Sequence, residues 1–227
     1  MQISEIFYSI QGEGILAGVP SVFVRTSGCN LRCAWCDTPY TSWQPEGRAM
    51  TVSEIVAAVT RHSAGHTVVT GGEPMIAPEV VDLCRLLREA RQHITVETAG
   101  TVCAPVVCDL MSISPKLRNS TPVSRDGGRW AAQHDRLRIQ PDVLRSLMEN
   151  YPYQLKFVVE RPEDMIEIVA LVRELEAGKD RVLLMPEGTD AETLREKGVW
   201  LAEICKESGF RYCPRLHVEL WGNKRGV

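Results

Sequence analysis

Apolar residues follow two alternating patterns along the chain. Short β-rich runs predict six strands, at residues 21–26, 66–71, 93–98, 106–114, 153–160 and 181–186. Segments of helical length, with apolar residues three and four positions apart, lie between most of these runs. Strands that alternate with helices build parallel βαβ units. The pattern therefore predicts an α/β fold, either an incomplete (β/α) barrel or an open parallel sheet, and does not separate the two.

The predicted helices have recognisable ends. Five segments show helical spacing: residues 51–62, 78–91, 141–150, 162–178 and 190–209. Thr51 and Glu54 form a capping-box pattern, and Pro78 stands where a proline in the first turn is tolerated. The last two segments end at Gly178 and Gly209, which predicts glycine caps at both helices.

Two stretches interrupt the alternation. Residues 37–50 form a polar loop without periodicity, and residues 117–140 carry Gly, Ser and Arg where a helix is expected. We interpret residues 117–140 as a flexible surface insertion rather than a mobile lid. Because no repeat or linker divides the chain, we expect residues 1–227 to form a single domain.

Composition narrows the function classes. The chain has 227 residues and a net charge of −3, which gives no electrostatic footprint for nucleic acid or a membrane surface. The first residues lack the features of a secretory signal, and no apolar run is long enough to span a bilayer. We therefore expect a cytoplasmic protein. Disulfides are disfavoured in that reducing compartment, so clustered cysteines indicate metal ligands or redox thiols.

Three of the eight cysteines, Cys29, Cys33 and Cys36, stand together directly after the strand predicted at residues 21–26. Ligands bind at the carboxyl ends of strands in such folds. Structural zinc takes four ligands, and the chain has no second CxxC pair. Three soft thiolates that leave one position vacant suit an iron–sulfur cluster with one open iron. Three buried cysteines, or a zinc site completed by a distant residue, are the alternatives.

The spacing Cys29-x3-Cys33-x2-Cys36, with Trp35 before the last cysteine, resembles the signature of the radical S-adenosylmethionine (SAM) enzymes. The resemblance implies a 4Fe–4S cluster whose open iron binds the amino and carboxylate groups of SAM. One electron from the cluster then yields a 5′-deoxyadenosyl radical, which abstracts hydrogen from the substrate. The resemblance also implies a full or partial (β/α)6 barrel.

Later motifs fit the same superfamily. The glycine pair of "GGEP" lets backbone approach a ligand closely, and the resemblance implies that this motif binds the methionyl amino group. The hydroxyl and ammonium of "SPK" can hold a carboxylate or ribose, and "MPEG" can present backbone to adenine. The resemblance thus implies these cofactor contacts: Trp35, Cys36, Asp37, Gly71, Gly72, Glu73, Ser114, Pro115, Lys116, Met185, Pro186, Glu187 and Gly188.

A closer resemblance covers most of the chain. The segments "SIQGEG", "CDT", "TGGEP", "ETAGT", "SPK" and "HVELWGNKRGV" together resemble the 7-carboxy-7-deazaguanine synthase family of queuosine precursor biosynthesis. The family contracts the ring of 6-carboxy-5,6,7,8-tetrahydropterin with loss of ammonia, a carbon–nitrogen lyase reaction. Ala99 stands where the family has asparagine, which leaves the roles of Glu97 and Thr98 open. The cofactor carries the hard chemistry, so no side chain needs to be a nucleophile.

The substrate residues follow from that resemblance. An amide and a carboxylate in "SIQGEG" can hydrogen-bond a nitrogen heterocycle, and Arg25 can clamp a carboxylate. The family implies a substrate set of Ile10, Gln11, Gly12, Glu13, Arg25, Thr70 and His217. It also implies a magnesium ion on Thr38 and the substrate, a flavodoxin-like one-electron reductant, and a homodimer.

Two other functions remain alternatives: a glycyl-radical activating enzyme, and a non-enzymatic zinc or iron–sulfur module. The first would share the cysteines and the glycine pair but has no need of "SIQGEG" or Arg25. The other five cysteines lie within apolar patterns, where we expect inert side chains that act as small hydrophobic residues: Cys84, Cys103, Cys108, Cys205 and Cys213.

Overall fold

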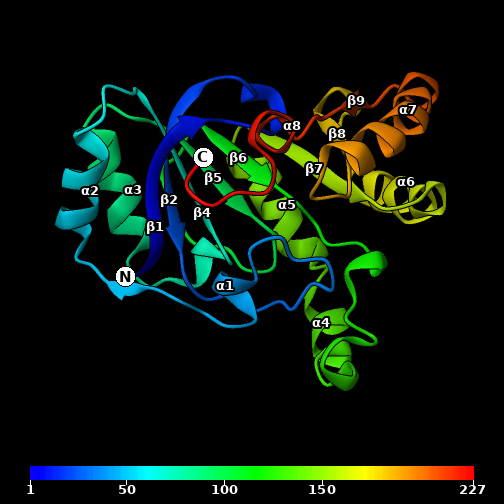
Figure 1. Cartoon of the computed structure of the whole chain (residues 1–227), viewed down its shortest axis with the longest axis horizontal. Helices are drawn as coiled ribbons and strands as arrows, with labels where there is room; N and C mark the ends of the chain where they lie inside the picture. The colour runs from blue at the N-terminus through cyan, green and yellow to red at the C-terminus, as the bar shows by residue number, and fades with distance from the viewer.

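Seven neighbouring parallel strands make up most of one nine-stranded sheet in the computed structural model, which describes residues 1–227 (Figure 1). The parallel strands are β2 (Pro20–Thr26), β4 (His66–Gly71), β5 (His93–Thr98), β6 (Leu110–Ile113), β7 (Tyr153–Val159), β8 (Val182–Pro186) and β9 (Arg211–Tyr212). Two antiparallel strands, β1 (Gln2–Ile10) and β3 (Arg48–Ala49), extend the sheet beyond β2.

The strand order decides between the two predicted folds. The sheet runs β3-β1-β2-β4-β5-β6-β7-β8-β9, so the parallel strands follow chain order without a reversal. A doubly wound sheet would reverse its order at a switch point. The outermost strands, β3 and β9, do not pair with each other, so the sheet stays open. The fold is therefore an unclosed, partial barrel, as the resemblance implied.

Helices fill most of the crossovers, and all five predicted helices are present. They are α1 (Pro39–Ser42), α2 (Val52–Thr60), α3 (Val80–Glu89), α4 (Ala131–Leu137), α5 (Pro141–Asn150), α6 (Met165–Glu174), α7 (Ala191–Ser208) and α8 (Leu216–Trp221). The capping box at α2 is confirmed, since Glu54 N donates to Thr51 Oγ1 and Thr51 N donates to Glu54. Gly209 caps α7 with a φ of 75°. None of the helices is both long and apolar enough to cross a lipid bilayer.

Several element boundaries differ from the prediction. No strand was predicted at β1, because only Ile3 of its nine residues is buried and the period-two signal is weak. Pro78 precedes the cap of α3 instead of lying in its first turn. The chain leaves α6 at Glu174 and reverses at Glu176, whose φ is 52°, before it reaches Gly178. No helix joins β5 to β6.

The main core lies between the sheet and its helices. A cluster of 32 buried residues includes Leu87 of α3, Leu147 of α5, Phe157 of β7 and Leu201 of α7. Helices α2 and α3 lie on one side of the molecule, and α6 and α7 lie at the other end (Figure 1). Truncating a large side chain such as Phe157 to alanine costs about 3–5 kcal/mol in such a core. This core holds the strand ends in place.

The five cysteines outside the segment from Cys29 to Cys36 differ in burial. Cys84, Cys205 and Cys213 are buried and Cys108 is half-buried, but Cys103 is exposed. Cys103 stands in the helix-free crossover between β5 and β6, which leaves its side chain exposed.

Candidate active site

A cavity of about 480 Å³ opens at the carboxyl ends of the parallel strands. Strands β2, β4, β5, β7 and β8 contribute Arg25, Thr70, Glu97, Lys156 and Met185 to its wall. The loop after β2 and the C-terminal segment close it from the sides. Strand ends are where ligands bind in barrels of this kind, so this cavity is the candidate active site.

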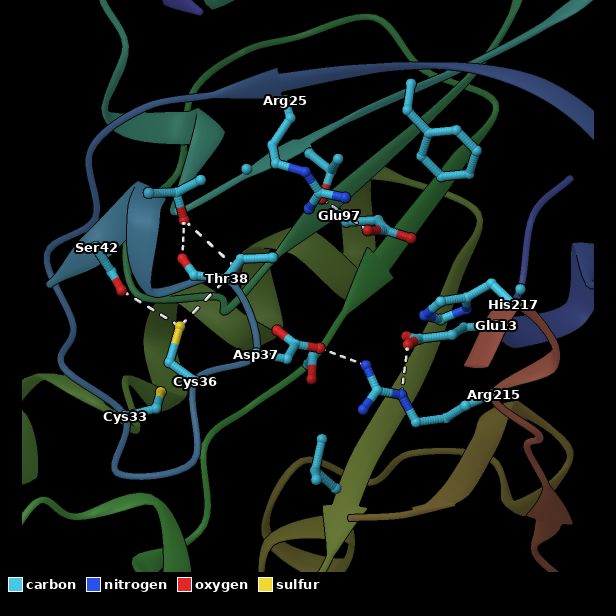
Figure 2. A pocket seen from close by; sticks show the side chains of 18 of the residues that line it. Glu13, Arg25, Cys33, Cys36, Asp37, Thr38, Ser42, Glu97, Arg215 and His217 are labelled. Carbon is cyan, nitrogen blue, oxygen red and sulfur yellow. Dashed lines mark hydrogen bonds and ion pairs between the residues drawn. The ribbon is translucent and has the colours of Figure 1, made fainter. Parts of the chain in front are cut away.

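The cysteine loop forms one wall of this cavity, and Cys29, Cys33 and Cys36 all line it (Figure 2 labels Cys33 and Cys36). Gly28 N donates to Thr41 O at 2.8 Å, which ties the start of the loop to α1. Burial raises the pKa of the Cys29 thiol to about 12 and also raises that of Cys33. Thiols in such a place become thiolates when a cationic centre binds them.

The chemistry of this donor set, three soft thiols from one loop, suits an iron–sulfur cluster. No three His, Cys, Asp or Glu side chains come close enough together to hold one ion. Two thiolates on one tetrahedral zinc, with bonds of about 2.3 Å, lie only about 3.8 Å apart. In a 4Fe–4S cube each cysteine bonds a different iron, so the sulfur atoms stand farther apart. The donor set therefore fits the iron–sulfur cluster.

Residues 117–140 support the cysteine loop. Arg32 N donates to His134 Nδ1 at 3.2 Å, so His134 Nε2 carries the ring proton and faces Ser120 Oγ at 2.8 Å. Ala34 N donates to Ser120 O at 2.8 Å, and Arg125 Nη1 donates to Ala34 O at 2.9 Å. His134 is buried, which lowers its pKa to about 4. The segment predicted as a flexible surface insertion thus contacts the loop through these bonds and carries helix α4.

The "GGEP" motif brings the end of β4 against the same loop. A β-carbon on Gly72 would lie 2.2 Å from Gly28 O, so only glycine fits. The Glu73 carboxylate is fully buried and accepts bonds from Met75 N, Thr98 Oγ1 and Ala99 N at 2.8–3.0 Å. Burial raises the pKa of Glu73. Its side chain ties β4 to β5 and does not reach the cavity.

Most predicted site residues meet in this one cavity. Its wall includes Ile10, Gln11, Gly12, Glu13, Arg25, Cys29, Cys33, Trp35, Cys36, Asp37, Thr38, Thr70, Gly71, Gly72, Ser114, Lys116, Met185, Glu187 and His217. Four expected cofactor contacts do not line it: Glu73, Pro115, Pro186 and Gly188. Lys116 Nζ donates to Ser114 O and Oγ at 2.8 Å, so the two side chains of "SPK" lie together.

Opposite the cysteines, polar side chains form a hydrogen-bonded set. Glu97 accepts from Gln11 Nε2 at 3.1 Å and from Thr70 Oγ1 at 2.8 Å. Arg25 lies above Glu97 in Figure 2, and Glu5 accepts from its Nε at 2.8 Å. Glu97, whose role the sequence left open, therefore joins "SIQGEG" to β4 and β5.

Sequence reasoning missed two buried cations. Lys156 and Arg215 both contact the carboxylate of Glu13, Arg215 through Nε at 3.2 Å, and Arg215 also pairs with Asp37 (Figure 2). Burial by itself raises the pKa of Glu13, but the charges of Lys156, Arg215 and His217 lower it well below its ordinary value. A lone lysine in the apolar run "YQLKFVV" was the available signal for Lys156.

The C-terminal residues also belong to the site. Residues 223–227 line the cavity, and Arg225 Nη1 donates to Glu46 at 3.0 Å. The Arg225 guanidinium lies 3.7 Å from the centre of the Tyr40 ring. Tyr40 in turn donates to Glu5, the partner of Arg25. The chain end is thus joined to the residues around Arg25.

Comparison with known proteins agrees with this geometry. Residues 23–115 match the model of the radical SAM superfamily. The 7-carboxy-7-deazaguanine synthase of Rhodopirellula baltica is 46% identical over 226 residues, which covers 99% of this chain and 88% of the relative. This chain belongs to the 7-carboxy-7-deazaguanine synthase family. The family prediction from the sequence is therefore confirmed.

Two further relatives support membership of the 7-carboxy-7-deazaguanine synthase family. The synthase of Halobacterium salinarum is 47% identical, and the alignment covers 98% of this chain and 91% of the relative. The crystal structure of QueE from Escherichia coli superposes with a TM-score of 0.68 at 26% identity, covering 93% of this chain and 92% of that one. As a radical SAM enzyme, a member of this family uses a 4Fe–4S cluster and SAM.

Proposed function

We propose that this enzyme converts 6-carboxy-5,6,7,8-tetrahydropterin to 7-carboxy-7-deazaguanine with loss of ammonia, as a carbon–nitrogen lyase. One observation carries the proposal: a single cavity unites three cysteine thiols with an amide, a carboxylate and a guanidinium, those of Gln11, Glu13 and Arg25. A glycyl-radical activating enzyme has no need of this polar wall.

The thiolates of Cys29, Cys33 and Cys36 would hold three irons of the cluster. With SAM bound, the cluster supplies the electron that generates a hydrogen-abstracting 5′-deoxyadenosyl radical. The backbone of Gly71 and Gly72 and the side chains beside it line the cavity next to these thiols. Gly71, Gly72 and their neighbours in the wall would bind and orient SAM and keep water out. The cofactor itself provides the reactive centre.

The polar wall suits the pterin. Its pyrimidinone edge presents adjacent N–H donors, and the Glu13 carboxylate and the Gln11 amide oxygen can accept them. Arg25 would hold the substrate carboxylate through its remaining N–H groups, since Nε is taken by Glu5. The Phe7 ring, 5.6 Å from the guanidinium, adds a second support. Arg25 is therefore oriented before substrate arrives.

Magnesium is a further part of the proposal. Thr38 lines the cavity, and its Oγ1 accepts from Thr41 Oγ1 at 3.4 Å. Asp37 is already paired with Arg215, so Thr38 would be the protein ligand, and substrate oxygens and waters would complete the shell. Titrating the enzyme with Mg²⁺ in the presence and absence of the Thr38→Ala change tests this assignment.

The cellular setting that we propose follows from the chemistry. Reduced thiols and an external one-electron donor of the flavodoxin type require a reducing compartment, which is the cytoplasm. The exposed apolar side chains of Leu220 and Trp221 on α8 support a homodimer, because such surfaces are commonly covered in assemblies. Sedimentation analysis of the reconstituted enzyme tests the assembly.

Product analysis tests the reaction itself. The enzyme, reconstituted anaerobically with iron and sulfide, is incubated with the tetrahydropterin, SAM, Mg²⁺ and a reductant. We expect 7-carboxy-7-deazaguanine and ammonia in equal amounts, and neither product from the Cys33→Ala variant. If 5′-deoxyadenosine forms without a deazaguanine, the ring contraction is wrong although the radical chemistry stands. A colourless protein with stoichiometric zinc would instead support the non-enzymatic module.

A further inference from the structure

Lys156 is a buried, charged residue in the cavity wall to which the proposed reaction assigns no role. It lies on the apolar strand β7, lines the cavity, and leaves only 8% of its side chain exposed. An unpaired ammonium in such a place costs several kcal/mol. Lys156 avoids this cost by contacting Glu13 Oε2. Lys156 therefore occupies a position that would suit an apolar residue, and its ammonium points at the Glu13 carboxylate.

Glu13 receives a second cation on its other oxygen. Arg215 Nε lies 3.2 Å from Glu13 Oε1, while Lys156 contacts Oε2. A carboxylate has about four acceptor positions, so two contacts leave capacity for donors of a ligand. Because the two cations come from different elements, β7 and the segment before α8, they restrain both the position and the tilt of the carboxylate.

Charged side chains from three parts of the chain surround the Glu13 carboxylate. Lys156 faces it from β7, Arg215 and His217 from the C-terminal segment, and Asp37 from the cysteine loop through Arg215. Lys156 is also influenced by Glu97 on β5 and by Cys213. Burial lowers the pKa of Lys156, but Glu13 and Glu97 raise it above its ordinary value, so the pair stays charged.

We propose that Lys156 is a positioning residue that, together with Arg215, holds Glu13 as a fixed, ionised acceptor selecting heterocycles with adjacent N–H donors. The amino-pyrimidinone edge of a pterin or deazaguanine presents such donors. A protonated Glu13 would carry a donor of its own and would tolerate an edge that presents acceptors. This inference rests on the proposed function, in which Glu13 binds that edge of the substrate.

Ligand binding by the reconstituted enzyme tests the inference. The probes are 7-carboxy-7-deazaguanine and its analogue without the 2-amino group, titrated anaerobically by calorimetry between about pH 5 and pH 8. The wild type should bind the first probe with little pH dependence and prefer it by about 100-fold or more. Lys156→Met should weaken binding by about tenfold or more, increasingly as pH falls, and should narrow the preference. Lys156→Arg should restore the flat profile.

A matched double variant separates positioning from folding. In Glu13→Gln/Lys156→Met the carboxylate and the ammonium are removed together, so neither charge is left buried without the other, and binding should be weak, flat with pH and without preference. A Lys156→Met enzyme with wild-type affinity, pH profile and preference would overturn the inference, as would an equal loss at every pH with the preference intact. No binding of either probe by the wild type would overturn the proposed function itself, and this inference with it.

Discussion

Gly72 and Cys29 are in such close approach that a β-carbon on Gly72 would lie 2.7 Å from the Cys29 β-carbon. The same atom would lie 2.2 Å from Gly28 O. Real β-carbons do not come this close to backbone, so the cysteine loop would have to move. The glycine pair and the cysteines thus depend on each other sterically.

Gly72→Ala should therefore abolish cluster binding while leaving most of the fold intact. The displaced loop can no longer present its three thiols together, so iron and sulfide per chain should fall to a small fraction of the wild-type values. Gly65→Ala is the matched control, because a β-carbon there meets nothing within 4 Å. Full iron content in Gly72→Ala would show that the close contact is not needed.

Alanine at Cys29, Cys33 or Cys36 should each reduce turnover to background. Each loss removes one ligand of a three-ligand set, and the cluster cannot be held by two thiolates alone. The measurement is product formed per chain, together with the visible absorbance of the cluster. Cys103→Ala, an exposed thiol outside the cavity, should keep both at the wild-type level.

His134 predicts a pH dependence of stability. Its pKa in the folded protein is about 4, below the ordinary value of 6.5. The unfolded chain therefore binds a proton first, so this contribution is fully present above about pH 6.5 and is lost as pH falls towards 4. The loss should be on the order of 1–3 kcal/mol in urea unfolding of the cluster-free protein. His134→Asn should remove this part of the slope; an unchanged slope would contradict the burial of a neutral ring.

Glu73→Gln should destabilise the protein rather than act on the cofactor directly. A glutamine replaces one acceptor oxygen by an amide that faces donors such as Ala99 N, leaving buried groups unpaired. We expect a loss of about 2–4 kcal/mol in the free energy of unfolding. Glu196→Gln, on the exposed side of α7, should change it by less than about 0.5 kcal/mol. A stable Glu73→Gln protein with weakened SAM binding would contradict this interpretation.

Arg25→Lys should raise KM for the tetrahydropterin and lower kcat/KM by about tenfold or more. Lysine cannot bind Glu5 and a substrate carboxylate at once with paired donors, as the guanidinium can. Steady-state kinetics with substrate and SAM varied separately measures the change. Arg85→Lys, on the exposed face of α3, is the control and should be neutral. A normal KM in Arg25→Lys would place the substrate carboxylate elsewhere.

The ends of the strands show which parts of the fold the local sequence pattern can predict. Residues 66–71 and 93–98 were predicted to the residue as β4 and β5, because both are short runs rich in the β-branched residues Val, Ile and Thr. The β1 strand was missed, because it lies at the antiparallel edge and most of its side chains are only half-buried. The cap of α6 was placed at the wrong residue, since Glu176 adopts the left-handed conformation that glycine usually takes.

The sequence by itself determined the chemistry of the cysteine site. Cys29, Cys33 and Cys36 lie within one loop, so their spacing along the chain decides that the three thiols stand together. Only the tertiary structure decided that Lys156 and Arg215, 143 and 202 positions from Glu13, converge on its carboxylate. It also decided that His134 supports Arg32 from 102 positions away. Buried charges and ring nitrogens find partners wherever the packed strands bring them, and no local pattern records that distance.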